Sequence, residues 1–337
     1  MNSIGENAIY LELKNISGNS SFVEMFFIMA GFFLYNTYKN KPDLTLGEFA
    51  VNKIIRLWPV MVFEVIVIAL FSSSFKTSNI FDILFLKCVG ISSQYKGITW
   101  YISPLFWITI FYFSLLKNFN NKKLNIVIVV MVYFSYVINI NHGYSRETIY
   151  YGLNLAVLRA ISGIGLGYLV GQAFNKYGFI LTQKTNKIHK KIAKTIFFSF
   201  IEGSALAFII YFSLFCNKHY NKFIFVIAFI VLLICFLVKQ GVISKLMDNN
   251  ISTFLGRFSY STYVMQQFSF NIMKRSIWRK SYIIDNVYIC IIISVLFSLL
   301  IGILVYFFVE KPLKILLSKI YLKLKQKYSN NKSHNVA

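Results

Sequence analysis

The recurrence of long apolar segments limits the fold of this chain more than any other feature. An α-helix of about 20 mainly apolar residues crosses a hydrocarbon layer of about 30 Å. Nine segments of suitable length and character lie at residues 22–38, 54–73, 99–117, 124–141, 152–175, 193–216, 222–239, 251–273 and 286–309. The sequence therefore predicts an all-α membrane helix bundle of about nine spans, with no soluble domain.

Composition supports a membrane protein, because only 14% of the 337 residues are charged and 57% are hydrophobic. Soluble domains carry about 25% charged residues. We divide the chain into a polar N-terminal lead-in at 1–21, a membrane helix bundle at 22–317 and a basic cytoplasmic tail at 318–337. Residues 80–91 are apolar but too short to span, so we expect them to lie at the interface or to re-enter the membrane.

The net charge of +23 is distributed between the apolar segments. Lys and Arg are dense in the loops after the first, third and fifth spans and in the tail. This alternation places those loops and the tail on the cytoplasmic side, in contact with lipid headgroups. Because the basic residues do not lie along one soluble face, we exclude nucleic-acid binding. The C-terminus is then cytoplasmic and the N-terminus external. The Lys-, Asn- and Ile-rich composition is typical of an AT-rich bacterial genome, so we expect a location in a bacterial cytoplasmic membrane. One loop does not fit this topology, because it would lie on the outer side although it is basic; its charges are Lys274, Arg275, Arg279 and Lys280. A further helix before residue 1 would bring both termini inside.

Cysteine and histidine side chains give no sign of metal or redox chemistry. The cysteines are Cys88, Cys216, Cys235 and Cys290, and the histidines are His142, His189, His219 and His334. They form no CxxC pair and no cluster with ligand spacing. We expect no metal and no bound cofactor.

Charged side chains inside the apolar segments need partners or a function, because each costs about 2.5–3.5 kcal/mol on insertion. They are Glu24, Arg56, Glu64, Arg159, Glu202 and Arg257, with Gln266 and Gln267 as neutral polar companions and Glu310 at the inner end of the last span. Glu24 and Glu310 have a simple alternative, which is that they lie at helix ends and reach water.

Two basic residues lie at the start of the second span. In "FAVNKIIRLWP" Lys53 and Arg56 are three residues apart and therefore share a helix face. Fixed cations at the cytoplasmic end of a bundle suit a phosphorylated ligand. The alternative is that both anchor the helix at lipid headgroups. Arg159 lies nearer mid-span, in "LRAISGIGLGYLVG", where the glycines allow close helix packing.

Six segments, in order, resemble motifs of the membrane acyltransferase family three, whose members acylate cell-surface glycans. They are "VEMFFIMAGFFL", "KIIRLWP", "TWYISPLF", "LRAISGIGLGYL", "LGRFSYSTYVMQ" and "FFVEKPLKILL", between residues 23 and 317. Each match is loose, and the specificity comes from their order.

The resemblance implies transfer of an acyl group, expected to be acetyl, from cytoplasmic acyl-CoA to a sugar hydroxyl of a surface polysaccharide or its lipid-linked precursor. It implies that Lys53, Arg56 and Arg159 bind acyl-CoA. It also implies a supporting or acceptor-side set of Glu24, Gly31, Trp100, Tyr101, Ser259, Tyr260, Gln266 and Glu310.

The sequence departs from the family pattern in two places. The first helix, with its basic residue and catalytic His, is absent, and Gln266 replaces the late-motif His, so no catalytic residue is assigned. Gln266 can hydrogen-bond but cannot act as a base. Three accounts remain open: an enzyme truncated at its N-terminus, an inactive member serving as a membrane subunit or carrier, or a transporter of an anionic solute.

Overall fold

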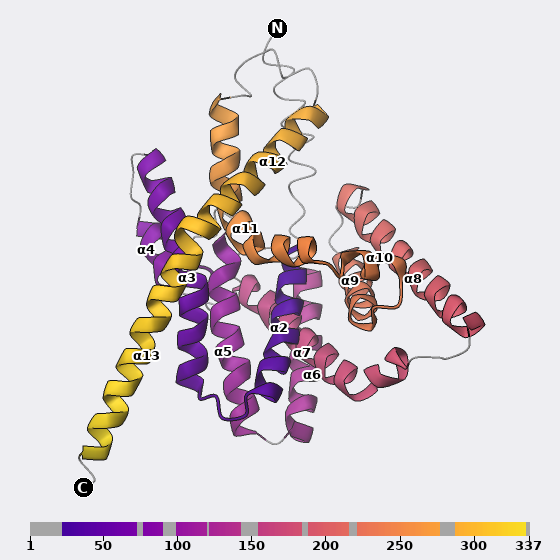
Figure 1. The fold of residues 1–337 in the computed structure, drawn as a ribbon, viewed down its shortest axis with the longest axis horizontal. Coiled ribbons are helices and arrows are strands. Elements are labelled where there is room, and N and C mark those ends of the chain that lie inside the picture. The colour runs from indigo at the N-terminus through magenta and orange to yellow at the C-terminus, as the bar shows by residue number, and fades with distance from the viewer. Residues whose placement is uncertain are drawn as a thin grey trace. The chain divides into compact units, whose positions relative to one another are not determined.

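The computed structural model describes residues 22–72, 77–89, 99–119, 121–142, 154–183, 188–215, 221–276 and 287–334, which are almost entirely helical (Figure 1). The helices are α2 (Phe22–Asn40), α3 (Leu46–Ser72), α4 (Thr77–Ile83), η1 (Thr99–Tyr101), α5 (Ile102–Asn118), α6 (Asn121–Asn141), α7 (Leu155–Thr182), α8 (Ile188–Phe215), α9 (Asn221–Val238), α10 (Val242–Met247), α11 (Asn250–Ser276), α12 (Val287–Val305), the π-helical turn η3 (Tyr306–Glu310) and α13 (Lys311–His334).

The predicted all-α fold is confirmed, and each of the nine predicted spans coincides with a helix. Among the described residues, six helical stretches are long and apolar enough to cross a membrane. They correspond to the predicted second to sixth spans and the ninth. Of the other three, α9 is apolar but shorter, and α2 and α11 do not meet that criterion of length and hydropathy.

The apolar segment predicted at 80–91 forms only the end of a short helix. The helix α4 ends at Ile83, and its last carbonyl accepts a hydrogen bond of 3.1 Å from the Trp58 indole of α3. Packing of α4 against the middle of α3 agrees with a segment that is too short to span. Residues 90 and 91 lie outside the described residues, as do the lead-in 1–21 and the loop residues Arg279 and Lys280.

The chain divides into two compact units, and each is described here by itself. Unit 1 comprises Met1–Leu44, Lys87–Tyr95 and Ser103–Thr253, and unit 2 comprises Thr45–Leu86, Lys96–Ile102 and Phe254–Ala337.

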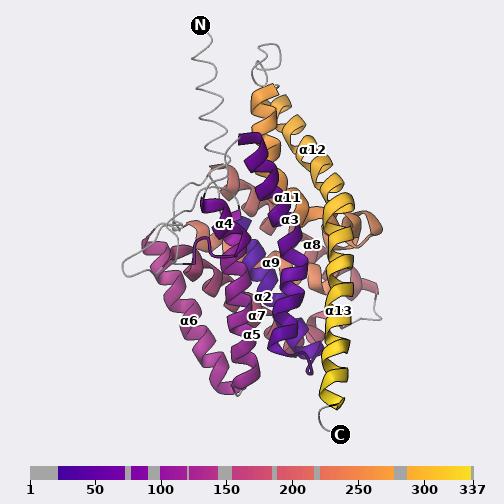
Figure 2. The ribbon, with the colours of Figure 1, turned by 90° about the vertical axis from the view of Figure 1, so that its left-hand side faces the viewer.

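The core of unit 1 is a direct backbone contact between α2 and α7, which Figure 2 shows side by side. A Cβ atom on Gly31 would lie 1.9 Å from the Ile164 carbonyl oxygen, and one on Gly167 would lie 1.9 Å from that of Ile28. Each glycine therefore faces the partner backbone with no side chain between. Small residues permit this close approach in membrane helices, as the sequence predicted for α7.

A buried carboxylate organises the second part of unit 1, where α8 packs on α9 and α10. Glu202 of α8 is fully buried, and its Oε2 atom accepts hydrogen bonds from the backbone N–H groups of Ile243 and Ser244, at 3.0 and 3.2 Å. These are first-turn N–H groups of α10, which have no partner within their own helix. This assigns a structural role to one of the intramembrane charges.

Glu202→Ala should lower the stability of the protein by about 1–3 kcal/mol, because two buried N–H groups of α10 lose their acceptor. Glu202→Gln should cost less, since its amide oxygen still accepts one or both bonds. Thermal unfolding of the three proteins in one detergent measures this order. Equal losses for the two variants would contradict the capping role.

Unit 2 is built around α3, α11 and the α12–η3–α13 helix. A Cβ on Gly302 of α12 would lie 2.0 Å from the Thr262 hydroxyl oxygen, so α12 packs tightly on α11. The Lys325 ammonium of α13 forms an ion pair with Glu48 in the first turn of α3. Figures 1 and 2 both show α13 running beside that part of α3. Residues 318–334 of the predicted tail thus continue a helix that begins at Lys311, and residues 335–337 lie outside the described residues.

Candidate functional site

The two predicted cations, Lys53 and Arg56, lie on α3 in unit 2. Arg56 is exposed and Lys53 is half-buried, with its ammonium 5.4 Å from the centre of the Phe49 ring. The two positive charges act on each other. In the part of the chain that the structure describes, no carboxylate lies within ion-pair distance of either side chain. Two neighbouring cations without an ion-pair partner favour an anion.

Two tyrosines from distant motifs meet at Arg56. The Tyr260 hydroxyl donates a hydrogen bond of 2.7 Å to the carbonyl oxygen of Leu57, the residue that follows Arg56. Tyr101 is buried, and its ring meets the Tyr263 ring edge-on with 5.0 Å between centroids. The Arg56 charge acts on the hydroxyls of both Tyr101 and Tyr260. The late motif and the "TWY" motif therefore converge on the basic motif.

A carboxylate completes this group. Glu310, the last residue of the π-helical turn, is buried, and its Oε2 atom accepts a hydrogen bond from the buried hydroxyl of Ser261. The Arg56 and Lys314 charges both act on Glu310. We call Arg56, Tyr101, Tyr260, Ser261 and Glu310 the α3–α11 cluster. It brings together four residues that the sequence predicted from four separate motifs.

The remaining predicted residues of unit 2 lie differently. Ser259 is exposed and donates to the Gly256 carbonyl of its own helix, at 2.9 Å. Trp100 is buried beside Tyr101, with 6.4 Å between ring centroids. Gln266 is half-buried further along α11. Sequence reasoning missed Ser261, because a serine beside Tyr260 carries no sign of a carboxylate 49 residues away.

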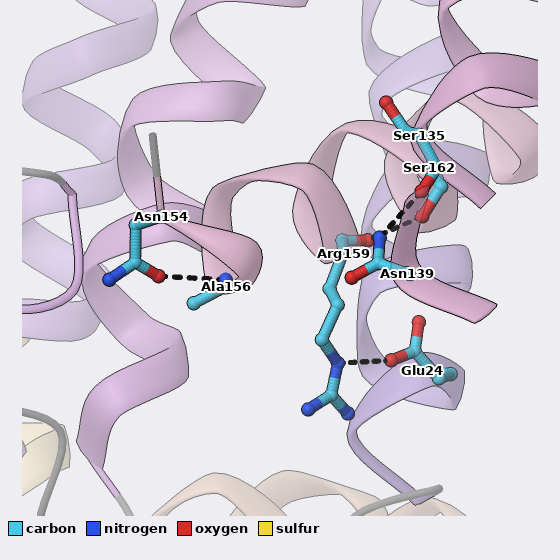
Figure 3. A network of polar contacts seen from close by, with 7 residues as sticks. All are labelled: Glu24, Ser135, Asn139, Asn154, Ala156, Arg159 and Ser162. Atoms are coloured by element: carbon cyan, nitrogen blue, oxygen red, sulfur yellow. Dashed lines mark hydrogen bonds and ion pairs between the residues drawn. The ribbon is translucent and has the colours of Figure 1, made fainter. Parts of the chain in front are cut away.

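A second polar group lies in unit 1, where α2, α6 and α7 meet (Figure 3). The Nε atom of Arg159 is 2.6 Å from Oε1 of Glu24, and both side chains are fully buried. On α7 the Ser162 hydroxyl donates to the Arg159 carbonyl at 3.0 Å, and on α6 the amide of Asn139 donates to the Ser135 carbonyl at 2.7 Å. Glu24 thus lies in the first turn of α2, but its carboxylate is buried and does not reach water.

The three predicted acyl-CoA residues are divided between the two units. Arg159 is held in unit 1 by the Glu24 carboxylate, and the pair is enclosed because both side chains are fully buried. Gly31 serves the α2–α7 contact. Lys53 and Arg56 belong to unit 2, where the exposed guanidinium of Arg56 is accessible to a ligand.

Comparison with known families identifies the chain. A family model described as an acyltransferase domain, acyltransferase family 3, matches residues 7–307. The chain belongs to this family. The resemblance found in the motifs is therefore confirmed, and the matched range includes Glu24, the two cations of α3, Arg159 and the "SYSTY" segment of α11. No curated protein and no solved structure matches the chain.

None of the three histidines within the described residues lies on a helix that supplies the α3–α11 cluster. His142 follows the end of α6, His189 lies in the first turn of α8 and His334 ends α13. His219 is outside the described residues.

Proposed function

We propose that this multi-pass membrane acyltransferase moves an acyl group, expected to be acetyl, from cytoplasmic acyl-CoA to a sugar hydroxyl. The acceptor is a cell-surface polysaccharide or its lipid-linked precursor. The protein then lies in the bacterial cytoplasmic membrane with its C-terminus inside. The family supports acyl transfer, and the chemistry of the α3–α11 cluster supports acyl-CoA as the donor of the acyl group.

The observation that carries the donor assignment is the pair of adjacent cations on one face of α3. Lys53 and Arg56 repel each other and have no carboxylate within ion-pair distance in the described part of the chain. A guanidinium binds two phosphate oxygens in a fork, and an ammonium adds a point charge. The several phosphate groups of CoA match this arrangement better than a single headgroup would.

The reaction that we propose exchanges a thioester for an ester. The sugar hydroxyl oxygen bonds to the thioester carbonyl carbon, the carbon–sulfur bond breaks, and the hydroxyl proton ends on the CoA thiol. No oxidant or metal takes part in this balance. The binding energy of the CoA phosphates, remote from the reacting carbon, serves to hold the thioester in position.

Removing both cations tests the donor. Lys53→Gln combined with Arg56→Gln should weaken acetyl-CoA binding by at least about 100-fold, since each charged hydrogen bond to phosphate contributes about 1.5–3 kcal/mol. Binding of radiolabelled acetyl-CoA to the purified protein in lipid nanodiscs measures the affinity. The matched control is Lys319→Gln with Lys323→Gln, which removes the same charge from exposed positions of α13 in the same unit.

Equal affinity in the two double variants would overturn the donor site. Acetyl-CoA that binds to the wild type but is never consumed, when the native lipid-linked glycans are supplied, would contradict the transferase and favour a non-catalytic subunit. If the protein is instead reconstituted into lipid vesicles, uptake of acetyl-CoA into the vesicle lumen would favour a transporter. Label transferred to the glycan and released by mild base as acetate would support the proposed ester.

A further inference from the structure

The helix that follows α12 contains one turn of different geometry, and this turn carries Glu310. Residues Tyr306–Glu310 form a π-helix, while α12 before it and α13 after it are α-helical. A π-turn accommodates an extra residue in an α-helix and occurs often at functional sites. It turns Glu310 toward α11, where the carboxylate is buried and accepts the hydrogen bond of Ser261.

Two consecutive residues of α11 connect this carboxylate to the basic motif. Tyr260 donates to the Leu57 carbonyl, and Ser261, the next residue, donates to Glu310. The first bond fixes the α3 backbone beside Arg56, and the second fixes the carboxylate. Because both bonds start from one turn of α11, they hold the helix that carries Arg56 and the turn that carries Glu310 at one distance from each other.

We infer that Glu310 is a positioning residue of the donor site, which orients the Arg56 guanidinium toward the phosphates of acyl-CoA. This inference rests on the proposed function. Glu310 is not within ion-pair distance of Arg56, so it acts through its charge at longer range and through α11: it holds Ser261, and the neighbouring Tyr260 holds the α3 backbone at Leu57, beside Arg56. Arg56 is exposed and therefore accessible to a ligand, whereas Glu310 is buried and can act only as a supporting group.

The direction in which Glu310→Gln changes the affinity for CoA distinguishes a positioning role from a simple effect of charge. If Glu310 only contributed a negative charge beside the site, Glu310→Gln would remove a repulsion and tighten the binding of a polyanion. If Glu310 positions Arg56, the same substitution weakens binding, because the guanidinium loses its preferred orientation. Ser261→Ala changes no charge and should act in the same direction through the carboxylate that it holds.

The experiment measures the affinity of CoA for the full chain in lipid nanodiscs. We expect Glu310→Gln to weaken CoA binding about tenfold and Ser261→Ala several-fold, within the range of one charge-assisted hydrogen bond. In an Arg56→Gln background neither change should have a further effect, because the group that they position is absent. Glu48→Gln removes the same charge from the first turn of α3 and should leave CoA affinity within about twofold, as an exposed pair contributes little.

Each result decides between the possibilities. Tighter or unchanged binding in both Glu310→Gln and Ser261→Ala overturns the inference, and so does an undiminished effect in the Arg56→Gln background. If Glu310→Gln does not fold, Ser261→Ala alone carries the test. If the wild type fails to bind CoA, or Arg56→Gln binds it as well as the wild type does, the proposed donor site fails instead.

Discussion

Arg159→Met should lower the stability of the protein by about 3–5 kcal/mol, since it removes one partner of a buried ion pair and leaves the other charge in place. Glu24 would keep its position on α2 with its carboxylate fully buried and its cation gone. Methionine is close to arginine in length and flexibility, so the loss reports the charge more than the packing. Reversible unfolding in mixed detergent micelles gives the difference in free energy.

The double variant Glu24→Leu with Arg159→Met should be more stable than Arg159→Met alone. Two apolar side chains of similar volume avoid burying an uncompensated charge, and such replacements are often close to neutral. If the losses of the two substitutions simply add in the double variant, the ion pair is not the source of the effect. CoA affinity measured on the same variants tests the donor role that the motifs predicted for Arg159. An unchanged affinity would restrict Arg159 to the α2–α7 interface.

Gly167→Ala is expected to disrupt the α2–α7 contact, because the added methyl group would lie 1.9 Å from the carbonyl oxygen of Ile28. That oxygen belongs to the backbone of α2 and cannot rotate away, so the two helices must separate and lose dispersion contacts along their length. We expect a loss of about 1–3 kcal/mol or more.

The control for this variant lies in α8. Gly203→Ala places a methyl group where no atom is within 4 Å. Since alanine favours a helix over glycine by about 0.5–1 kcal/mol, this variant should be neutral or slightly more stable. A parallel measurement of melting temperature separates close packing from helix propensity. Equal losses in both glycine variants would show that the α2–α7 contact tolerates expansion.

The sequence predicted the helices because a long apolar segment has few alternatives in lipid. It also located the charges that need an explanation, including Glu24, Arg56, Glu202 and Glu310. Their partners could not be predicted, since pairing depends on which helices meet. Glu24 and Arg159 are 135 residues apart, and Ser261 is 49 residues from Glu310.

The family resemblance placed Arg159 with the acyl-CoA ligands and Glu24 on the acceptor side, and the structure joins these two residues to each other in unit 1. Motif order carries no information about distance between side chains. The resemblance likewise divided Arg56 from Tyr101, Tyr260 and Glu310, and the structure brings these four residues together because they lie on helices that meet within unit 2.

The π-turn has a consequence for any labelling experiment on the C-terminal helix. A helical wheel advances by about 100° for each residue. A wheel phased on α12 and continued through Tyr306–Glu310 is therefore out of phase in α13, and it would assign residues such as Lys314 and Lys319 to the wrong faces. Cysteine-accessibility data should show a period of about 3.6 residues within α12 and within α13, with a shift in phase between the two at the π-turn.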